Sequence, residues 1–306
     1  MPKKIIFMGT PEFSIPALNS LIESKKEIIA VYSQPPNKSH RGQTENPSAI
    51  EKFAKENSLN VRTPKNLDSE TEFNYFKNLN PDLVIVVAYG KIIPKRYLTL
   101  PNYGFINIHA SLLPKWRGAA PMQRSIMNLD TETGISIMKI VEQLDAGPVM
   151  HQVKVKIDTN TSTKKLSSML SKLGAKSMIE CIKKIENNKT MFKEQDHSKA
   201  SYAKKISKGE SRIKWEESAK KILAKINALN PNPGAWFEYK NNRYKIWQAK
   251  ISQDKGNVGH TLDDKLTIAC GDNSIQILEI QKEGKNKLLL DKFLIGNQIK
   301  EGQKID

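Results

Sequence analysis

Two polar side chains at the end of a predicted strand are the residues best suited to chemistry. Asn107 and His109 stand two positions apart in the run YGFINIHASLLPKWRG. Because side chains alternate between the faces of a strand, Asn107 and His109 share one face, while the neighbouring isoleucines point to the other. An amide donor beside an imidazole can bind a carbonyl oxygen and move a proton, a combination that suits acyl transfer.

A loop and a later carboxylate complete this candidate site. The strand is followed by four residues that turn a loop around the polar pair: Ser111, Leu112, Leu113 and Pro114. Asp145, in Leu-Asp-Ala-Gly, follows another predicted strand, and a carboxylate that reached the imidazole would fix its tautomer. Each residue also has an ordinary explanation: Asn107 as a cap of the junction, His109 as a core imidazole, and Asp145 as a turn former.

Alternating strand and helix patterns in the first half of the chain must position these residues. We expect strands at 4–8, 28–32, 82–88, 104–109 and 134–141, and helices at 11–24, 48–58, 68–78 with a cap at Asp68, and 119–127. This alternation predicts an α/β fold with a doubly wound, mostly parallel, Rossmann-like sheet. Ligands of such sheets bind at the carboxyl ends of strands. The turn after Gly9 lacks the further glycines of a dinucleotide site, so we do not expect NAD.

The second half of the chain has a different character. A long amphipathic helix is expected at 162–187 and another helix at 218–229. Five short β-like runs follow and predict a small OB-like β-barrel: 235–239, 244–251, 266–269, 275–280 and 289–294. We therefore expect a catalytic domain at 1–188, a polar linker at 189–206 and a C-terminal domain at 207–306.

The basic residues are unevenly distributed. The net charge is +17, and residues 164–225 carry 17 basic and 7 acidic side chains, more than half of the excess in one fifth of the chain. Forty-two of the 49 basic residues are lysines, which is also what a biased genome composition would give. A localised basic stretch indicates contact with a phosphate backbone.

Two arginines and one loop are further candidates for anion binding. Arg117 and Arg124 bracket a Gly-Ala-Ala-Pro turn and fit either anion recognition or a structural ion pair. The polar loop 33–44 carries Lys38 and Arg41 at its centre and is either solvated surface or a grip on a polyanionic substrate.

Several classes of protein are disfavoured. No apolar run approaches the ~20 residues that span a bilayer, and the N-terminal run is too short for a signal peptide. Cys181 and Cys270 lie in apolar-periodic segments and are expected to be buried thiols, and no His or Cys cluster has the spacing of metal ligands. We expect a cytoplasmic protein with no metal and no membrane partner.

Four segments resemble one enzyme family over essentially the whole chain. NIHASLLPKWRGAAPMQRSI, LDAG, IIFMGTPEFS and NPNPGAWF are similar to the 10-formyltetrahydrofolate-dependent formyltransferases. The resemblance implies that Asn107, His109 and Asp145 are catalytic, and that the loop around Arg41 with Lys38 binds tRNA. It also implies folate contacts from the SLLP loop and from a strand end, at Ser111, Leu112, Leu113, Pro114, Val86, Ala88, Tyr89 and Gly90.

The activity implied by the resemblance is formyl transfer from 10-formyltetrahydrofolate to the amino group of methionine on initiator methionyl-tRNA. The resemblance also implies that the C-terminal barrel binds the tRNA. We expect the protein to be a monomer. A nucleotide-sugar or glycinamide-ribotide formyltransferase would share the trio and the folate without needing the barrel. A folate hydrolase would use water as the acceptor. A catalytically idle tRNA-binding protein would have degenerate site residues, yet all three are present.

Overall fold

The structure of the protein is a computed structural model that describes residues 2–39 and 44–306. Contacts divide the chain into two compact units, each assembled from three stretches. Unit 1 comprises Met1–Pro121, Thr133–Val155 and Ser167–Ala203, and unit 2 comprises Met122–Glu132, Lys156–Leu166 and Lys204–Asp306. The predicted linker, 189–206, is thus divided at Ala203, with most of it inside unit 1.

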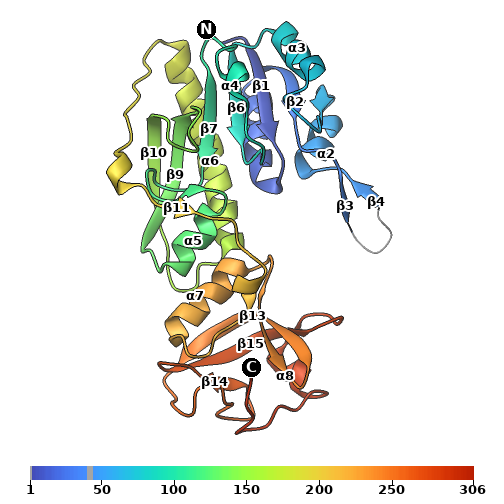
Figure 1. Cartoon of the computed structure of the whole chain (residues 1–306), viewed down its shortest axis with the longest axis vertical. Coiled ribbons are helices and arrows are strands. Elements are labelled where there is room, and N and C mark those ends of the chain that lie inside the picture. The colour runs from blue at the N-terminus through green and yellow to red at the C-terminus, as the bar shows by residue number, and fades with distance from the viewer. Residues whose placement is uncertain (1, 40–43) are drawn as a thin grey trace. The chain divides into compact units, whose positions relative to one another are not determined.

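A seven-stranded sheet forms the centre of unit 1 (Figure 1), in the order β10-β9-β7-β6-β1-β2-β5. The five strands from β7 to β5 in this order are parallel, and β9 runs antiparallel to β7. The predicted doubly wound, mostly parallel sheet is confirmed. Its strands are β1 (Lys4–Gly9), β2 (Glu27–Tyr32), β5 (Val61–Arg62), β6 (Leu83–Val87), β7 (Phe105–His109), β9 (Glu132–Lys139) and β10 (Val149–Lys156).

Helices cover both faces of this sheet. On one face, Phe76 of α3 (Glu70–Leu79) and Tyr97 of α4 (Lys95–Leu98) pack into an apolar core with the strands. On the other face, α6 (Thr163–Glu186) approaches Ile108 so closely at Gly174 that a Cβ there would lie 2.7 Å from Cγ2 of Ile108. The remaining elements of unit 1 are η1 (Glu12–Ser14), α1 (Ile15–Glu23), β3 (Asn37–Ser39), β4 (Thr44–Asn46), α2 (Ala49–Glu56), β8 (Arg117–Gly118), η2 (His197–Lys199) and β11 (Tyr202–Ala203). The helix α5 (Pro121–Met127) belongs to unit 2 except for its first residue.

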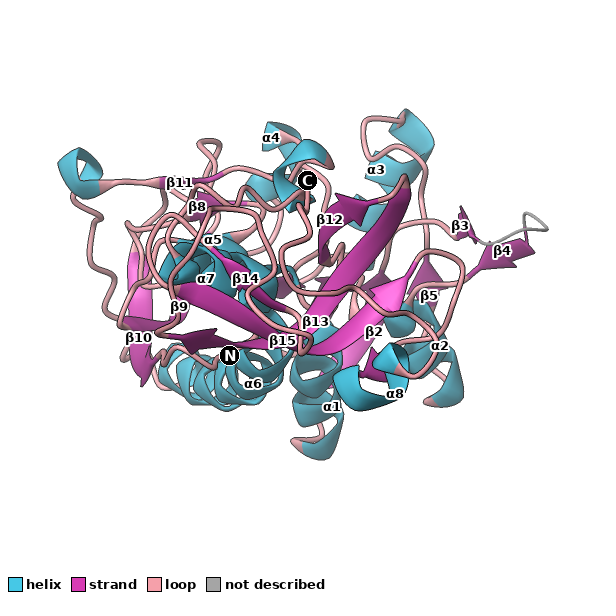
Figure 2. Cartoon of the chain, turned by 90° about the horizontal axis from the view of Figure 1, so that it is seen from below, coloured by secondary structure: helices cyan, strands magenta, loops and turns pink. Residues whose placement is uncertain are grey.

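Unit 2 contains an antiparallel sheet wrapped around its own apolar core, with α7 packed against β13. The two longest strands, β13 and β15, run side by side (Figure 2). Inward positions alternate along β12, where Ala235, Phe237 and Tyr239 are buried and Trp236 and Glu238 face outward. The elements are η3 (Gly209–Ser211), α7 (Ala219–Leu229), β12 (Ala235–Tyr239), β13 (Asn242–Ser252), β14 (Thr267–Ala269), β15 (Ser274–Lys282), β16 (Leu288–Leu289) and α8 (Leu290–Leu294).

Backbone hydrogen bonds outside the named strands close this sheet into a ring. The N–H of Gly259 donates to the carbonyl of Ala269 in β14 (2.9 Å), and the N–H of Ile305 donates to the carbonyl of Gly259 (2.7 Å). Asp306 and Glu238 of β12 then exchange two backbone hydrogen bonds of 2.7 and 3.0 Å. The sheet is thereby continuous from β12 through β13, β15, β14 and these segments back to β12, as a barrel requires.

Three local expectations differ from the structure. Of the run 289–294, Leu289 ends the strand β16 and the other residues form the helix α8, because Leu290 and Phe293 are spaced to bury one helical face. The cap of α3 is Ser69 rather than Asp68, since its hydroxyl accepts the N–H of Glu72. β10, an alternating strand at the edge of the sheet, was absent from the predicted elements.

Candidate active site

Asn107 and His109 lie at the carboxyl end of β7, between β6 and β9. The predicted alternation holds, since Ile108 faces α6 while Phe105, two residues before Asn107, joins the core beneath α3. Asn107 is half-buried, and its side-chain amide makes no hydrogen bond to any residue of the described ranges. The amide is therefore available to donate to a ligand.

Both ring nitrogens of His109 face groups of unit 1. Nε2 lies 2.9 Å from the carbonyl oxygen of Trp116, which can only accept, so the proton of the neutral ring is assigned to Nε2. Nδ1 lies 3.6 Å from Oδ2 of Asp145. In the neutral ring Nδ1 is therefore the nitrogen without a proton, and it faces a carboxylate. The ring is buried, with 5% of the residue's surface exposed.

Asp145 lies in the turn between β9 and β10. Its Oδ2 accepts the backbone N–H of Gly118 at 2.8 Å. Its other oxygen, Oδ1, makes no hydrogen bond within residues 2–39 and 44–306. One carboxylate oxygen is therefore held by the protein and the other is left for a ligand. The structure brings together all three members of the predicted trio.

Three non-glycine residues around these side chains have left-handed backbone conformations. Ala88 has φ 47°, Trp116 has φ 64° and Asp145 has φ 48°. A positive φ is uncommon for non-glycine residues, and for a bulky one such as tryptophan it is an outlier that the surroundings must impose. Strain of this kind gathers at functional sites.

The loop 111–114 is held by polar contacts from the neighbouring strands. The hydroxyl of buried Ser111 donates to the carbonyl of Lys115 at 2.5 Å, so it shapes its own loop. Ser136 of β9 donates to the carbonyl of Ser111 (2.6 Å), and Gln152 of β10 donates to that of Leu113 (2.9 Å). Leu112 is only partly buried, and Pro114 follows a cis peptide bond.

The end of β6 presents few side chains to a ligand. Val86 and Tyr89 point into the apolar core, and burial raises the pKa of the Tyr89 hydroxyl. Ala88 and Gly90 are exposed. The Tyr89 carbonyl accepts hydrogen bonds from the side chains of Thr10 (2.8 Å) and Gln34 (3.0 Å), which fixes this strand end.

Residues 195–203, here called the return segment, reach the site although the sequence indicated only a linker. β11 pairs in parallel with β8, and the N–H of Arg117 donates to the carbonyl of Ser201 at 2.8 Å. The hydroxyl of Ser201 accepts the N–H of Trp116 at 2.9 Å. The return segment therefore holds the backbone that contacts His109 and Asp145. Its polar, aperiodic composition gave no signal of this role.

The two arginines have different environments. Arg124 forms a bidentate pair with Glu210, with distances of 2.6 and 3.2 Å, and this contact lowers the pKa of Glu210 to about 2. The structural alternative therefore holds for Arg124. Arg117 is 1% exposed and donates to Gln195 and to His197.

The remaining predictions have the following outcomes. Of Lys38, the structure describes only the backbone, within the short ribbon β3–β4, and Arg41 lies outside the described residues. Cys181 and Cys270 are buried free thiols, as expected, and burial raises their pKa values to about 11 and about 12.

Within the described ranges, no group of three His, Cys, Asp or Glu side chains is arranged to hold a metal ion. No helix in that part of the chain has the length and apolarity to cross a bilayer.

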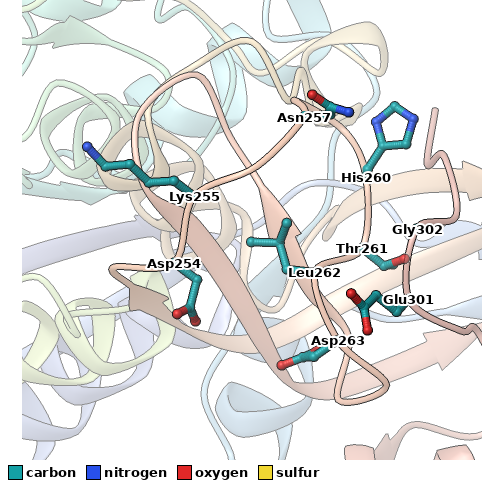
Figure 3. Close-up of a pocket in the computed structure, with 9 residues that line it drawn as sticks. All are labelled: Asp254, Lys255, Asn257, His260, Thr261, Leu262, Asp263, Glu301 and Gly302. Atoms are coloured by element: carbon teal, nitrogen blue, oxygen red, sulfur yellow. The ribbon is translucent and has the colours of Figure 1, made fainter.

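A hollow in unit 2 contrasts with this site (Figure 3). It lies between the loop 254–263 and the turn at Glu301 and Gly302. The carboxylate of Asp263 at its wall accepts two backbone N–H groups and the hydroxyl of Thr267, at 2.8 to 2.9 Å. This carboxylate serves its own turn rather than a ligand.

A mostly parallel sheet with Asn107, His109 and Asp145 at the end of one strand, followed by a small barrel, is the arrangement expected of a two-part transferase. The sequence profile of the formyl transferase family matches residues 3–182, and the profile of the formyl transferase C-terminal domain matches residues 205–298. The chain belongs to the formyl transferase family. A methionyl-tRNA formyltransferase of Pelagibacter ubique (strain HTCC1062) is 51% identical over 307 aligned residues, which cover 100% of this chain and 99% of the relative.

Solved structures share the fold at lower identity. A methionyl-tRNA formyltransferase from Clostridium thermocellum has a TM-score of 0.59 at 19% identity, covering 82% of this chain and 95% of its own. An N-formyltransferase from Helicobacter canadensis, in complex with folinic acid and dTDP-3-aminofucose, has a TM-score of 0.67 at 19% identity, covering 92% and 100%. At these identities the likeness concerns the fold alone.

Proposed function

We propose that this protein transfers the formyl group of 10-formyltetrahydrofolate to the amino group of methionine on initiator methionyl-tRNA. The observation that carries the proposal is the meeting of Asn107, His109 and Asp145 at the carboxyl end of β7, each with an atom suited to acyl transfer. The full-length similarity to a methionyl-tRNA formyltransferase supports the choice of acceptor.

We assign a different task to each side chain. As the neutral amine adds to the formyl carbon, the carbonyl oxygen becomes an oxyanion, and the uncommitted amide of Asn107 donates to it. Such a donor contributes about 3–4 kcal/mol to catalysis. The amine must lose a proton, and Oδ1 of Asp145 is the free acceptor. When the bond from the formyl carbon to the folate nitrogen breaks, that nitrogen takes up a proton. Asp145 passes the proton that it received from the amine to Nδ1 of His109, and Nδ1 delivers it to the folate nitrogen, which returns both side chains to their starting states.

We place the folate between the loop 111–114 and the end of β6. Exposed Ala88 and Gly90 with the partly buried Leu112 offer the accessible surface, while Ser111, Leu113, Pro114, Val86 and Tyr89 shape it from behind. Hydrogen bonds fix both the loop 111–114 and the end of β6, so these segments do not need to be ordered by the ligand.

We propose that unit 2 binds the tRNA through the outward face of β12 and β13. The guanidinium of Arg243 lies 3.9 Å from the ring centroid of Trp236, and that of Arg212 lies 5.6 Å from it. Lys245 lies over Trp247 in the same strand, at 5.7 Å. Cations interleaved with half-buried aromatic rings suit a polyanion that also presents bases. We also propose Lys38 and Arg41 as tRNA contacts. We keep residues 1–188 as the proposed catalytic domain, 189–206 as the linker and 207–306 as the tRNA-binding domain.

The test is an acceptor comparison with one folate donor. Purified protein with 10-formyltetrahydrofolate should formylate methionyl initiator tRNA far faster than methionyl elongator tRNA. A dTDP-amino sugar and glycinamide ribotide should be inactive acceptors. A preference for either small acceptor would replace the proposal with the corresponding formyltransferase, and release of formate without an acceptor would indicate a hydrolase. A cytoplasmic location and a monomeric state remain predictions.

A further inference from the structure

The turn that carries Asp145 is held by one side chain from the return segment. Nε2 of Gln195 donates to the carbonyl of Asp145 at 2.9 Å and to the carbonyl of Gly147 at 2.7 Å. Asp145 has a positive φ, a conformation that non-glycine residues adopt uncommonly. The two hydrogen bonds from Gln195 act on the carbonyls on both sides of Ala146 and so favour this conformation.

The orientation of Gln195 is set by a buried cation. Its Oε1 accepts from Nε (3.1 Å) and from Nη2 (2.8 Å) of Arg117. Because an arginine can only donate, the oxygen of the Gln195 amide must face Arg117 and its NH2 group must face the turn. Among the described residues, no carboxylate forms an ion pair with Arg117, whose other side-chain partner is Nδ1 of His197 at 3.1 Å.

Arg117 also belongs to the backbone that holds the trio. The preceding carbonyl, of Trp116, contacts His109, and the following N–H, of Gly118, contacts the carboxylate of Asp145. The side chain of Arg117, through Gln195, reaches the main chain of that same aspartate. Asp145 is thus held at its carboxylate and at its carbonyl by two routes that both start at Arg117.

We propose that Gln195 is a positioning residue for catalysis, which aims the carboxylate of Asp145 through the two hydrogen bonds from its NH2 group. Gln195 has 7% of its surface exposed and touches no reacting atom, so it acts through Asp145. The inference depends on the proposed formyl transfer for its assay. Absence of formyl transfer by the unaltered protein would refute the function, whereas the variants below decide the role of Gln195.

Two substitutions separate positioning from anchoring. Gln195→Met keeps the approximate shape and removes all four hydrogen bonds. Gln195→Glu keeps an acceptor for Arg117, with added charge attraction, but removes the donor to the turn. If Gln195 positions Asp145, both variants should lower kcat by about 10²-fold, as small misplacements of catalytic groups do, with the KM for folate little changed. Ser198→Ala, in the exposed part of the return segment, is the control and should behave as the unaltered protein.

A double-substitution cycle distinguishes positioning of Asp145 from a purely structural role of Gln195, because only positioning makes the effects of the two substitutions on the rate non-additive. Because Gln195 acts through Asp145, Gln195→Met should lower the single-turnover rate little further once Asp145→Asn is in place. Thermal melting of each variant fixes an assay temperature at which it is folded. The proposal is overturned if Gln195→Glu keeps the kcat of the unaltered protein, or if the two substitutions multiply their effects in the double variant.

Discussion

The site in unit 1 and the outward face of the barrel in unit 2 solve different problems. His109 and Asp145 are nearly enclosed, and each is fixed by a backbone contact at 2.8 or 2.9 Å. Arg243 and Lys245 are at least partly exposed and lie over aromatic rings, and Lys245 also donates to the carbonyl of Pro233 at 2.9 Å. Moving a proton requires atoms placed within fractions of an ångström, whereas binding a polyanion sums many weak contacts. Substitutions in the two regions should therefore differ in both size and kind of effect.

The largest decrease in the single-turnover rate is expected for His109→Ala. Removal of the imidazole removes the proton carrier, so the single-turnover rate should fall by about 10²–10⁴-fold with folate affinity retained. Asn107→Ala, which removes the proposed oxyanion donor, should lower the single-turnover rate by about 10²–10³-fold. Rapid-quench formyl transfer with saturating tRNA measures both. If either variant lost only substrate affinity and kept its chemical rate, the assignment of that residue would fail.

Asp145→Asn should lower the single-turnover rate of formyl transfer by about 10²-fold or more, because the side chain can no longer accept a proton. The asparagine side chain can still accept the N–H of Gly118, so the turn should persist and the melting temperature should stay unchanged. An Asp145→Asn protein with normal activity would show that this residue only forms the turn.

Arg243→Ala should produce a smaller effect, on tRNA binding and not on the chemical rate. Loss of the phosphate contact proposed for Arg243 should raise the KM for methionyl-tRNA by about 3–10-fold, leave kcat unchanged and reduce the salt dependence of tRNA binding by about one unit of slope. Lys52→Ala, which removes a charge from α2, is the matched control. Equal effects of both substitutions would assign the tRNA affinity to overall charge and not to this face.

The smallest effect is expected at the pair of Arg124 and Glu210, which contributes to stability and not to chemistry. The pKa of Glu210 is lowered from 4.5 to about 2, so the pair stabilises the fold above pH 4.5 and its contribution is lost as the pH falls toward 2. Glu210→Gln should lower the free energy of unfolding by about 1 kcal/mol or less near neutral pH, since the carboxylate is partly exposed. Urea unfolding at several pH values should show this difference vanish in acid, and a pH-independent difference would contradict the assignment.

The parts of the site that lie on regular elements could be predicted, and those that rest on irregular backbone could not. The apolar run of β6 and the alternation of β7 follow from burial and strand geometry, so the shared face of Asn107 and His109 was available from sequence. Which atoms they meet depends on the conformation of Trp116 and Asp145, which no periodicity encodes.

The return segment shows the second limit. Gln195 and Arg117 are polar residues whose burial depends on each other and on carbonyls of a turn 50 residues away. Local composition assigns such residues to solvent, because a pattern of apolar positions is the signal that sequence reasoning uses for burial. The cap of α3 is a different case. Ser69 and Glu72 have the spacing of a capping box, which is a local signal present in the sequence.

The late position of Gln195 in the chain has a consequence for synthesis on the ribosome. Asp145 and the amide that holds its turn are 50 residues apart, and all three trio residues precede that amide. At roughly 5–20 residues per second, the aspartate turn is synthesised some seconds before Gln195. The nascent polypeptide therefore carries its reactive groups for a time without the hydrogen bonds that orient them, and completion of the fold also completes the catalyst.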